Sequence, residues 1–240
     1  MRIARYLPNT ITCLNLLSGT IAVIVGIEGN FLLSVYFVLL ASLFDFMDGF
    51  TARLLKAYSP MGKELDSLAD LVSFGFAPAI LLYKEYNLTQ GMSVLTFMPL
   101  LIIISSALRL AKFNIDTQQS ENFIGMPTPT NAIIICMLIH FSLNNQFLGS
   151  ITGSIWFIPV FSIVMSALLI SKIPMFSLKF KSLKWEGNEK RISIIIIAII
   201  LFVISIFFGI TWSASLLATF VIYLLINVIE FSIKFFALKQ

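Results

Sequence analysis

FLLSVYFVLLASLFDFMDGFTARLLKAYSPMGKELDSLADLVSFGFAPAILLY, residues 31–83, is the stretch that decides the fold of this chain. It contains two apolar runs separated by a short polar connection, 57–64. A helix that spans a bilayer needs about 20 predominantly apolar residues, so the stretch predicts two spanning helices, roughly 31–56 and 65–83. Because the connection is short, we expect the two helices to be antiparallel neighbours.

The remaining apolar runs extend the same pattern along the chain. The 240 residues are 58% hydrophobic and only 12% charged, with a mean hydropathy of +0.96, whereas a soluble domain carries about 25% charged residues. The sequence therefore predicts an all-α, polytopic membrane helical bundle. Its spans, about eight in number, lie near 9–27, 31–56, 65–83, 93–112, 128–147, 151–171, 192–210 and 213–236.

The basic residues indicate how the bundle is oriented. With the N-terminus in the cytoplasm and eight crossings, every one of the 16 Lys and Arg residues except Lys84 falls on the cytoplasmic side. Cytoplasmic loops of membrane proteins are enriched in these residues. We therefore predict a multi-pass protein of the cell membrane with both termini in the cytoplasm. The bases form no stripe interleaved with aromatics on a soluble surface, so we expect membrane lipids as partners and no nucleic acid.

Four aspartates are crowded where the two quoted spans meet. Asp45 and Asp48 lie near the end of the first span, and Asp66 and Asp70 near the start of the next. Spacings of three and four residues place each pair on one helical face. Ionisable groups inside a membrane are costly, and four neighbouring carboxylates repel one another. Divalent cations with oxygen ligands, Mg²⁺ or Mn²⁺, remove this repulsion.

Small and basic neighbours extend this acidic site. Two metals roughly 4 Å apart can clamp a phosphate between them. Gly49 and Ala52 continue the face of the first pair of aspartates, and Gly62 lies four residues before Asp66. Such small residues permit close approach of a ligand or of another helix. Arg53 supplies a fork for phosphate oxygens. We therefore predict metal-dependent phosphoryl transfer at the cytoplasmic ends of these helices, with a structural ion network as the alternative.

The same residues carry a resemblance to a known family. Residues 45–53, DFMDGFTAR, and 62–70, GKELDSLAD, match every fixed position of the CDP-alcohol phosphatidyltransferase signature. The chain is therefore similar to this family. The resemblance implies a six-helix catalytic core, usually a homodimer, that binds a CDP-linked lipid. In that chemistry an alcohol attacks the lipid-side phosphorus and CMP leaves.

The resemblance also implies roles for individual residues. Asp45, Asp48 and Asp66 would be metal ligands, and Asp70 would be a ligand or, more importantly, the general base for the incoming hydroxyl. Residues that would bind the CDP-lipid are Gly49, Ala52, Arg53, Gly62, Asn9 and Thr12. Asn9 and Thr12 stand at the entry of the first helix, where capping of that helix is the alternative.

Further stretches are similar to the membrane-integral phosphatidylserine synthases, and together they cover most of residues 8–180. They are Pro8 to Gly19, Ser73 to Pro78, Arg109 to Asn114, Phe123 to Pro129 and Ser171 to Lys179. The resemblance implies CDP-diacylglycerol as donor, L-serine as acceptor, and phosphatidylserine and CMP as products. Two departures are visible: Lys112 stands where that group usually has Arg, and Thr130-Asn131 stand where small alanines are common.

Four residues are candidates for binding serine: Arg109, Lys112, Asn114 and Ser73. Arg109 and Lys112 can bind a carboxylate, although both can equally be anchors that extend to the headgroups. Charge alone does not exclude glycerol phosphate, inositol phosphate or another alcohol, nor an archaeal-type lipid donor, so the preference for serine rests on resemblance. A cation transporter is a remote alternative, because all four aspartates lie toward one membrane face and no second half of the chain repeats them.

The chain divides into three predicted parts. Residues 1–172 form the catalytic transmembrane core, 173–191 a basic cytoplasmic segment, and 192–240 a C-terminal transmembrane hairpin added to the six-helix core. The basic segment mixes Lys with aromatic residues, so we expect it to lie at the interface with anionic headgroups. An ordinary loop with basic anchors is the alternative. We expect the hairpin to serve packing or lipid contact.

Overall fold

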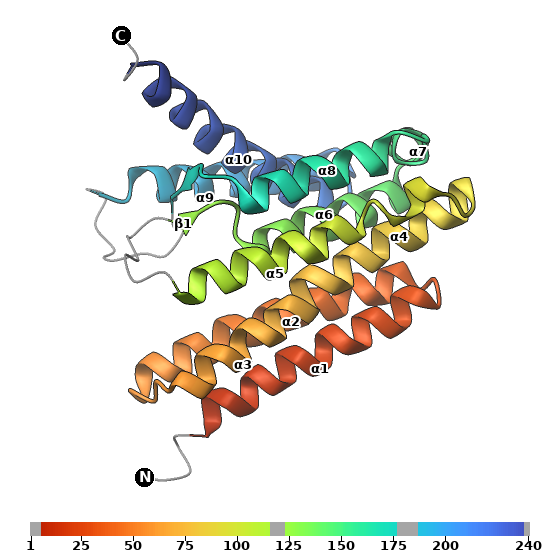
Figure 1. Ribbon diagram of the computed structural model, residues 1–240. Helices are drawn as coiled ribbons and strands as arrows, with labels where there is room; N and C mark the ends of the chain where they lie inside the picture. The colour runs from red at the N-terminus through yellow and green to blue at the C-terminus, as the bar shows by residue number, and fades with distance from the viewer. Residues whose placement is uncertain (1–5, 116–122, 177–186, 238–240) are drawn as a thin grey trace.

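The computed structural model describes residues 6–115, 123–176 and 187–237, which form a bundle of helices with one two-stranded ribbon (Figure 1). In chain order the elements are α1 (Leu7–Ile27), α2 (Phe31–Leu54), α3 (Pro60–Asp70), η2 (Leu71–Phe76), α4 (Ala77–Gln90), η3 (Val94–Phe97), α5 (Leu100–Ile115), β1 (Phe123–Ile124), α6 (Thr128–Asn144), α7 (Gln146–Thr152), α8 (Phe157–Ile170), β2 (Pro174–Met175), α9 (Glu189–Phe207) and α10 (Trp212–Ala237). The predicted all-α membrane bundle is confirmed. Most of the predicted interfacial segment, residues 177–186, lies outside the described residues.

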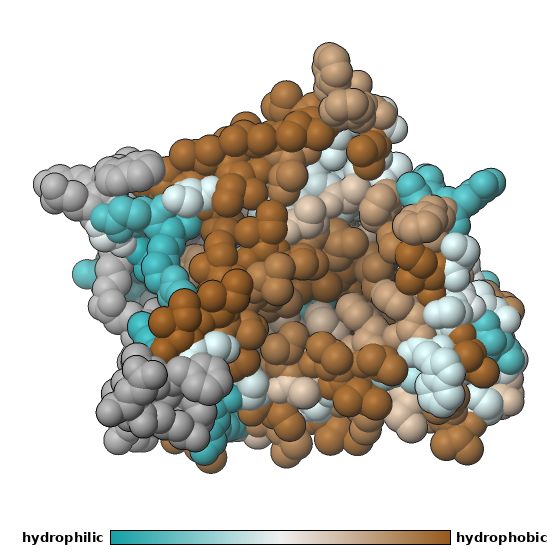
Figure 2. Space-filling view, turned by 90° about the horizontal axis from the view of Figure 1, so that it is seen from above, coloured by the Kyte–Doolittle hydropathy of each residue, from teal (hydrophilic) through white to brown (hydrophobic). Residues whose placement is uncertain are grey.

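Six of the described helical segments are long and apolar enough to cross a membrane. The 17-residue α6 is shorter, and α7 and α8 are long and apolar enough only when taken together, with a bend of 77° between them. The predicted continuous span 151–171 is therefore broken, because α7 ends at Thr152 and α8 begins only at Phe157. Figure 2 shows hydrophobic residues across the middle of one face, with hydrophilic residues toward its two ends, as a bilayer requires.

The start of α1, the start of α3, the end of α5 and the end of α10 lie at the same end of the bundle, on the left in Figure 1. Asp45 and Asp48, toward the end of α2, and Asp66 and Asp70, in α3, lie toward this end of the bundle. The turn between α1 and α2 and the turn between α4 and α5 lie at the opposite end.

One π-helical turn, η2, allows the third predicted span to continue as a helix through Pro78. Pro78 has no N–H to donate, and in an α-helix its ring would clash with the carbonyl of Phe74. The wider turn over Leu71–Phe76 accommodates it, with the N–H of Ala77 donating to the carbonyl of Val72. The helix therefore continues from Pro60 to Gln90. The widened turn begins directly after Asp70, as π-helical turns often do beside functional sites.

Close contacts fix α1 against this helix. A Cβ added to Gly19 would lie 2.1 Å from the Oγ of Ser73, so only glycine fits there. The same hydroxyl donates to the backbone carbonyl of Asn15 over 3.0 Å. On its other side α1 packs on α2, where the hydroxyl of Ser34 donates to the carbonyl of Ala22 over 2.6 Å. These contacts set the positions of α1, α2 and η2 relative to one another.

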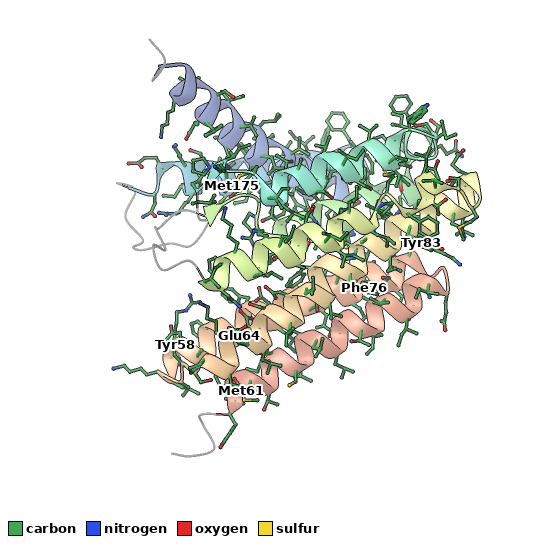
Figure 3. The ribbon with its side chains drawn as sticks, in the orientation of Figure 1. Tyr58, Met61, Glu64, Phe76, Tyr83 and Met175 are labelled. Carbon is green, nitrogen blue, oxygen red and sulfur yellow. The ribbon has the colours of Figure 1, made fainter. Side chains whose placement is uncertain are left out.

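A short antiparallel ribbon, which the sequence did not predict, joins the segments before α6 and after α8. Phe123 pairs with Met175, and Ile124 with Pro174. Gly125 follows with φ +78°, and a Cβ there would lie 2.5 Å from the carbonyl oxygen of Leu169. Figure 3 shows Met175 toward the same end of the bundle as Glu64, on the other side of α5.

Candidate functional site

The sequence before and at the start of α3 fixes where this helix begins, and so the helical face on which its carboxylates lie. Ser59 has extended backbone angles, and its Oγ accepts from the N–H of Gly62 over 3.0 Å, which caps the helix. Pro60 at the first position suits a helix start. A Cβ on Gly62 would lie 2.9 Å from Oδ1 of Asn9, so the glycine lets α1 approach closely. Asp66 then follows one turn later on the same face.

Three of the four predicted metal ligands come together. Carboxylate oxygens of Asp45, Asp48 and Asp66 all lie within 4.8 Å of one another. Two oxygens on opposite sides of a bound Mg²⁺ lie about 4.2 Å apart, twice the usual Mg–O distance. The spacing and the hard oxygen donors therefore fit a divalent cation with only small side-chain movements. A cluster of carboxylates without a cation would be strongly self-repelling.

Asp70 lies beside this trio. Its side chain is only 8% exposed, and its charge is repelled by Asp45 and Asp66 and, less strongly, by Asp48. The amide nitrogen of Asn15 donates to Oδ1 of Asp70 over 3.3 Å. A buried carboxylate that accepts one hydrogen bond and adjoins a cation site retains an oxygen that can receive a proton.

Helix α1 also contacts the trio directly. The hydroxyl of Thr12 lies 2.7 Å from Oδ2 of Asp48 and 3.1 Å from the carbonyl of Pro8. A hydroxyl has a single proton, and the shorter, charge-assisted bond to Asp48 is the stronger of the two. Thr12 therefore acts in this geometry as a partner of the carboxylate, in addition to its place near the helix start.

A pocket of about 560 Å³ adjoins the trio. Its lining residues are Pro8, Asn9, Thr12, Asp48, Gly49, Ala52, Ala57, Tyr58, Ser59, Pro60, Gly62, Lys63, Asp66 and Phe113. This lining includes all the predicted CDP-lipid-binding residues except Arg53, which is exposed near the end of α2. A Cβ on Gly49 would have no atom nearer than Nη2 of Arg53 at 4.0 Å, so the glycine leaves this wall open. Figure 3 shows Tyr58, from the lining, beside the start of α3.

Arg109 on α5 brings a cation near Asp70. The guanidinium is attracted electrostatically by Asp70. Its Nη1 donates to Oγ1 of Thr128 over 3.5 Å, and within the described residues its buried Nε has no hydrogen-bond partner. A guanidinium carries five N–H donors, so Arg109 can still bind an anionic group. Thr128 was not predicted as a site residue; its one signal in the sequence was its place between Pro127 and Pro129.

The other predicted serine-binding residues make different contacts. Ser73 is fully buried and bonded to α1. The amide nitrogen of Asn114 donates to Oε2 of Glu64 over 3.1 Å and to Oγ of Ser67 over 3.0 Å, which ties α5 to α3. Lys112 is exposed. Of the four predicted residues, Arg109 is therefore the one with a described interaction with the aspartates.

Comparison with known proteins gives consistent matches. The family model for CDP-alcohol phosphatidyltransferase matches residues 5–173, so α9 and α10 lie outside it. A CDP-diacylglycerol–serine O-phosphatidyltransferase of Mycobacterium leprae is 36% identical over 176 residues, which are 70% of this chain and 57% of that protein. One from Helicobacter pylori is 32% identical over 184 residues, 75% of this chain and 74% of that protein.

A relative from an archaeon matches as well. Archaetidylserine synthase of Methanothermobacter thermautotrophicus is 37% identical over 131 residues, 54% of this chain and 55% of that protein. The matched stretch is thus little more than half the length of the mycobacterial and archaeal relatives.

Proposed function

Since the chain belongs to the CDP-alcohol phosphatidyltransferase family, as its signature predicted, we propose that it is a phosphatidylserine synthase. It transfers the phosphatidyl group of CDP-diacylglycerol to the hydroxyl of L-serine and releases CMP. The observation that carries the proposal is the carboxylate trio of Asp45, Asp48 and Asp66 at the edge of a 560 Å³ pocket, with a base candidate, Asp70, and a half-buried arginine, Arg109, nearby. The names of the relatives supply serine as the acceptor.

The trio and the pocket form the donor side of the reaction. Asp45, Asp48 and Asp66, with Asp70 beside them, would hold divalent cations, Mg²⁺ or Mn²⁺ and two in number. When bound, these neutralise charge on the diphosphate and on the departing CMP. The pocket takes the nucleotide end of the CDP-lipid. Gly49, Ala52 and Gly62 leave room for it.

Three further side chains bind the donor. Arg53 holds the diphosphate at the mouth of the pocket, and Asn9 and Thr12 contact the cytidine or its phosphates.

Asp70 is the general base. Its carboxylate takes the proton of the serine hydroxyl while the serine oxygen forms a bond to the lipid-side phosphorus. The bond between that phosphorus and the CMP oxygen breaks, and CMP keeps the electron pair. Asn15 orients Asp70 through its donated hydrogen bond. The proton then passes from Asp70 to solvent.

Arg109 binds the carboxylate of serine on the acceptor side. Its free donors and its closeness to Asp70 support this assignment, because the acceptor hydroxyl must reach the base while the carboxylate is held nearby. Lys112 adds positive charge at the rim. Asn114 and Ser73 contribute mainly by holding α5 and η2 beside α3 and α1.

The protein works in the cell membrane as a homodimer, with both termini and the site in the cytoplasm. The start of α1 and the end of α10 at one end of the bundle agree with this orientation. Chemical cross-linking in membranes and protease accessibility of tags at both termini test the two statements. A monomer, or termini on opposite sides, would contradict them.

Purified protein with a panel of substrates tests the reaction. CMP release is measured with CDP-diacylglycerol, Mn²⁺ or Mg²⁺, and serine, glycerol 3-phosphate or inositol phosphate in turn. Release with serine alone supports the proposal, and release only with another alcohol reassigns the enzyme within its family. Because an archaetidylserine synthase is among the relatives, CDP-archaeol is included as donor. Metal flux without CMP release would favour a transporter.

A further inference from the structure

Two side chains of α10 hold the backbone at Phe176. The hydroxyl of Tyr223 donates to the carbonyl of Phe176 over 2.9 Å, and the N–H of Phe176 donates to Oδ1 of Asn227 over 2.9 Å. Asn227 in turn donates from Nδ2 to the carbonyl of Tyr223 over 2.7 Å, one turn earlier. Tyr223 and Asn227 are only 2% and 3% exposed. Both backbone groups of one residue are thus fastened by a clasp, defined here as Tyr223 and Asn227.

The two clasp residues differ from other buried polar residues of α10 in the groups to which they hydrogen-bond. Ser215, Thr219, Tyr223 and Asn227 form a buried polar row at intervals of four residues. The hydroxyls of Ser215 and Thr219 donate to carbonyls of α10 itself. Tyr223 and Asn227 instead bond to a segment 47 and 51 residues earlier in the chain. Packing of the rings adds to this, since the centroids of Phe176 and Tyr223 are 5.0 Å apart.

The fastened segment leads to the acceptor side of the site. Phe176 follows β2, which pairs with β1. The N–H of Gly125, directly after β1, donates to the carbonyl of Ile173 over 2.9 Å, and the chain then enters α6 at Thr128. Thr128 is the residue that accepts from Arg109. A rigid ribbon therefore connects the clasp with one partner of the guanidinium.

We propose that Tyr223 and Asn227 are positioning residues of the acceptor side, which hold the ribbon and thereby fix Thr128, the hydrogen-bond partner of Arg109. The inference rests on the proposed function only in taking Arg109 as the residue that binds the acceptor. It assigns a role to the C-terminal hairpin beyond packing and lipid contact. It also places a determinant of acceptor binding outside residues 5–173, the part matched by the family model.

Steady-state kinetics of Tyr223→Phe test the role. Without the hydroxyl, the buried carbonyl of Phe176 loses its partner and the ribbon relaxes. The KM for serine should rise about three- to tenfold, the effect of losing one hydrogen bond, while the KM for CDP-diacylglycerol changes less than about twofold. Tyr86→Phe is the matched control, because Tyr86 is equally buried but lies on α4. An unchanged serine KM, or equal rises in both constants, would overturn the proposal.

A second substitution separates positioning from general destabilisation. In an Arg109→Lys background the planar fork is gone, so Tyr223→Phe should change the serine KM by less than about twofold. The same fold-change in both backgrounds would show that Tyr223 acts independently of Arg109, against the proposal. Asn227→Ala should behave as Tyr223→Phe does.

Hydrogen–deuterium exchange tests the clasp without turnover. Amides of residues 173–176 and 124–128 should exchange faster in Tyr223→Phe than in Tyr86→Phe, and unchanged exchange would overturn the proposal. If the wild type uses another alcohol, the serine assignment fails, and the KM of that alcohol replaces serine in the same tests. Failure of the proposed function and failure of the clasp therefore give different results.

Discussion

The donor side of the site, built by α1, α2 and α3, differs from the acceptor side, built by α5, the start of α6, the ribbon and α10. On the donor side three carboxylates lie within 4.8 Å of one another and small residues open a pocket. On the acceptor side one arginine, Arg109, donates to the neutral hydroxyl of Thr128. In the proposed reaction the donor side would bind a polyanion through cations, whereas the acceptor side would orient a small molecule through a single guanidinium.

The two sides also differ in how their residues are held. Asp66 and Asp70 are placed by local features, the Ser59 cap and a helical repeat of four. Arg109 is placed by a residue outside its own helix, Thr128. We therefore expect donor-side substitutions to affect chemistry and acceptor-side substitutions to affect acceptor binding.

Replacement of the base should have the largest effect. Asp70→Asn keeps the size of the side chain but cannot accept a proton, so turnover should fall by about 10²- to 10⁴-fold. Binding of CDP-diacylglycerol should stay within about twofold, because the trio of Asp45, Asp48 and Asp66 is intact. CMP release and equilibrium binding of the lipid measure the two quantities. Near-normal turnover would refute the assignment of Asp70 as base.

Removal of the half-buried Arg109 should separate the two sides. Arg109→Ala should raise the KM for serine at least about tenfold, because a charged hydrogen bond to a carboxylate is lost. The KM for CDP-diacylglycerol should change far less. Lys112→Ala is the matched control, and since Lys112 is exposed we expect a smaller rise. Equal effects of Arg109→Ala on both substrates would make Arg109 a structural residue.

The sequence predicted that the aspartates cluster, and the structure brings three of them together, because the determinants of this arrangement are local. Charges within an apolar run are conspicuous, a spacing of three or four residues fixes their face, and a short connection forces α2 and α3 together. The sequence predicted that all four carboxylates form one metal site, whereas in the structure three of them form a trio and Asp70 lies beside it. Asp70 differs from the trio in how deeply its side chain is buried against α1, and the spacing of residues in the sequence does not determine this burial.

The acceptor side was harder to predict because its contacts are long-range. Tyr223 and Asn227 are ordinary polar residues of an apolar helix, and their partner at Phe176 is about 50 residues away. The ribbon strands have two residues each, too short for a periodic pattern. The break between α7 and α8 was missed for a related reason, because hydrophobicity continues through residues 155–158 and only Gly153 and Ser154 interrupt it.

Two glycines on the donor side, Gly62 and Gly49, should have different roles, the first in helix packing and the second in leaving space for the ligand. Gly62→Ala forces a methyl group against Asn9 and Ser59 and should destabilise the fold by about 1–3 kcal/mol. Gly49→Ala adds its methyl where no atom is nearer than 4.0 Å, so stability should stay within about 0.5 kcal/mol of wild type. Gly49→Ala should nevertheless weaken CDP-diacylglycerol binding, because the methyl enters the pocket.

Thermal unfolding in detergent and lipid titration measure these two effects. A stable Gly62→Ala variant would mean that α1 and α3 can separate slightly without cost. Full lipid affinity in Gly49→Ala would place the nucleotide elsewhere in the pocket.

The smallest effect on stability and on the serine KM is expected from breaking the exposed ion pair of the hairpin. This substitution tests whether the clasp, and no other part of α10, affects the acceptor side. Lys190 on α9 pairs with Glu230 on α10, one turn beyond the clasp, and the two side chains are 55% and 37% exposed. Exposed pairs contribute about 0–1 kcal/mol, so Glu230→Gln should lower stability by less than about 1 kcal/mol and leave the serine KM unchanged. If Glu230→Gln raised the serine KM as much as Tyr223→Phe, general loosening of the hairpin would explain both, and the acceptor side would depend on the whole of α10 rather than on two side chains.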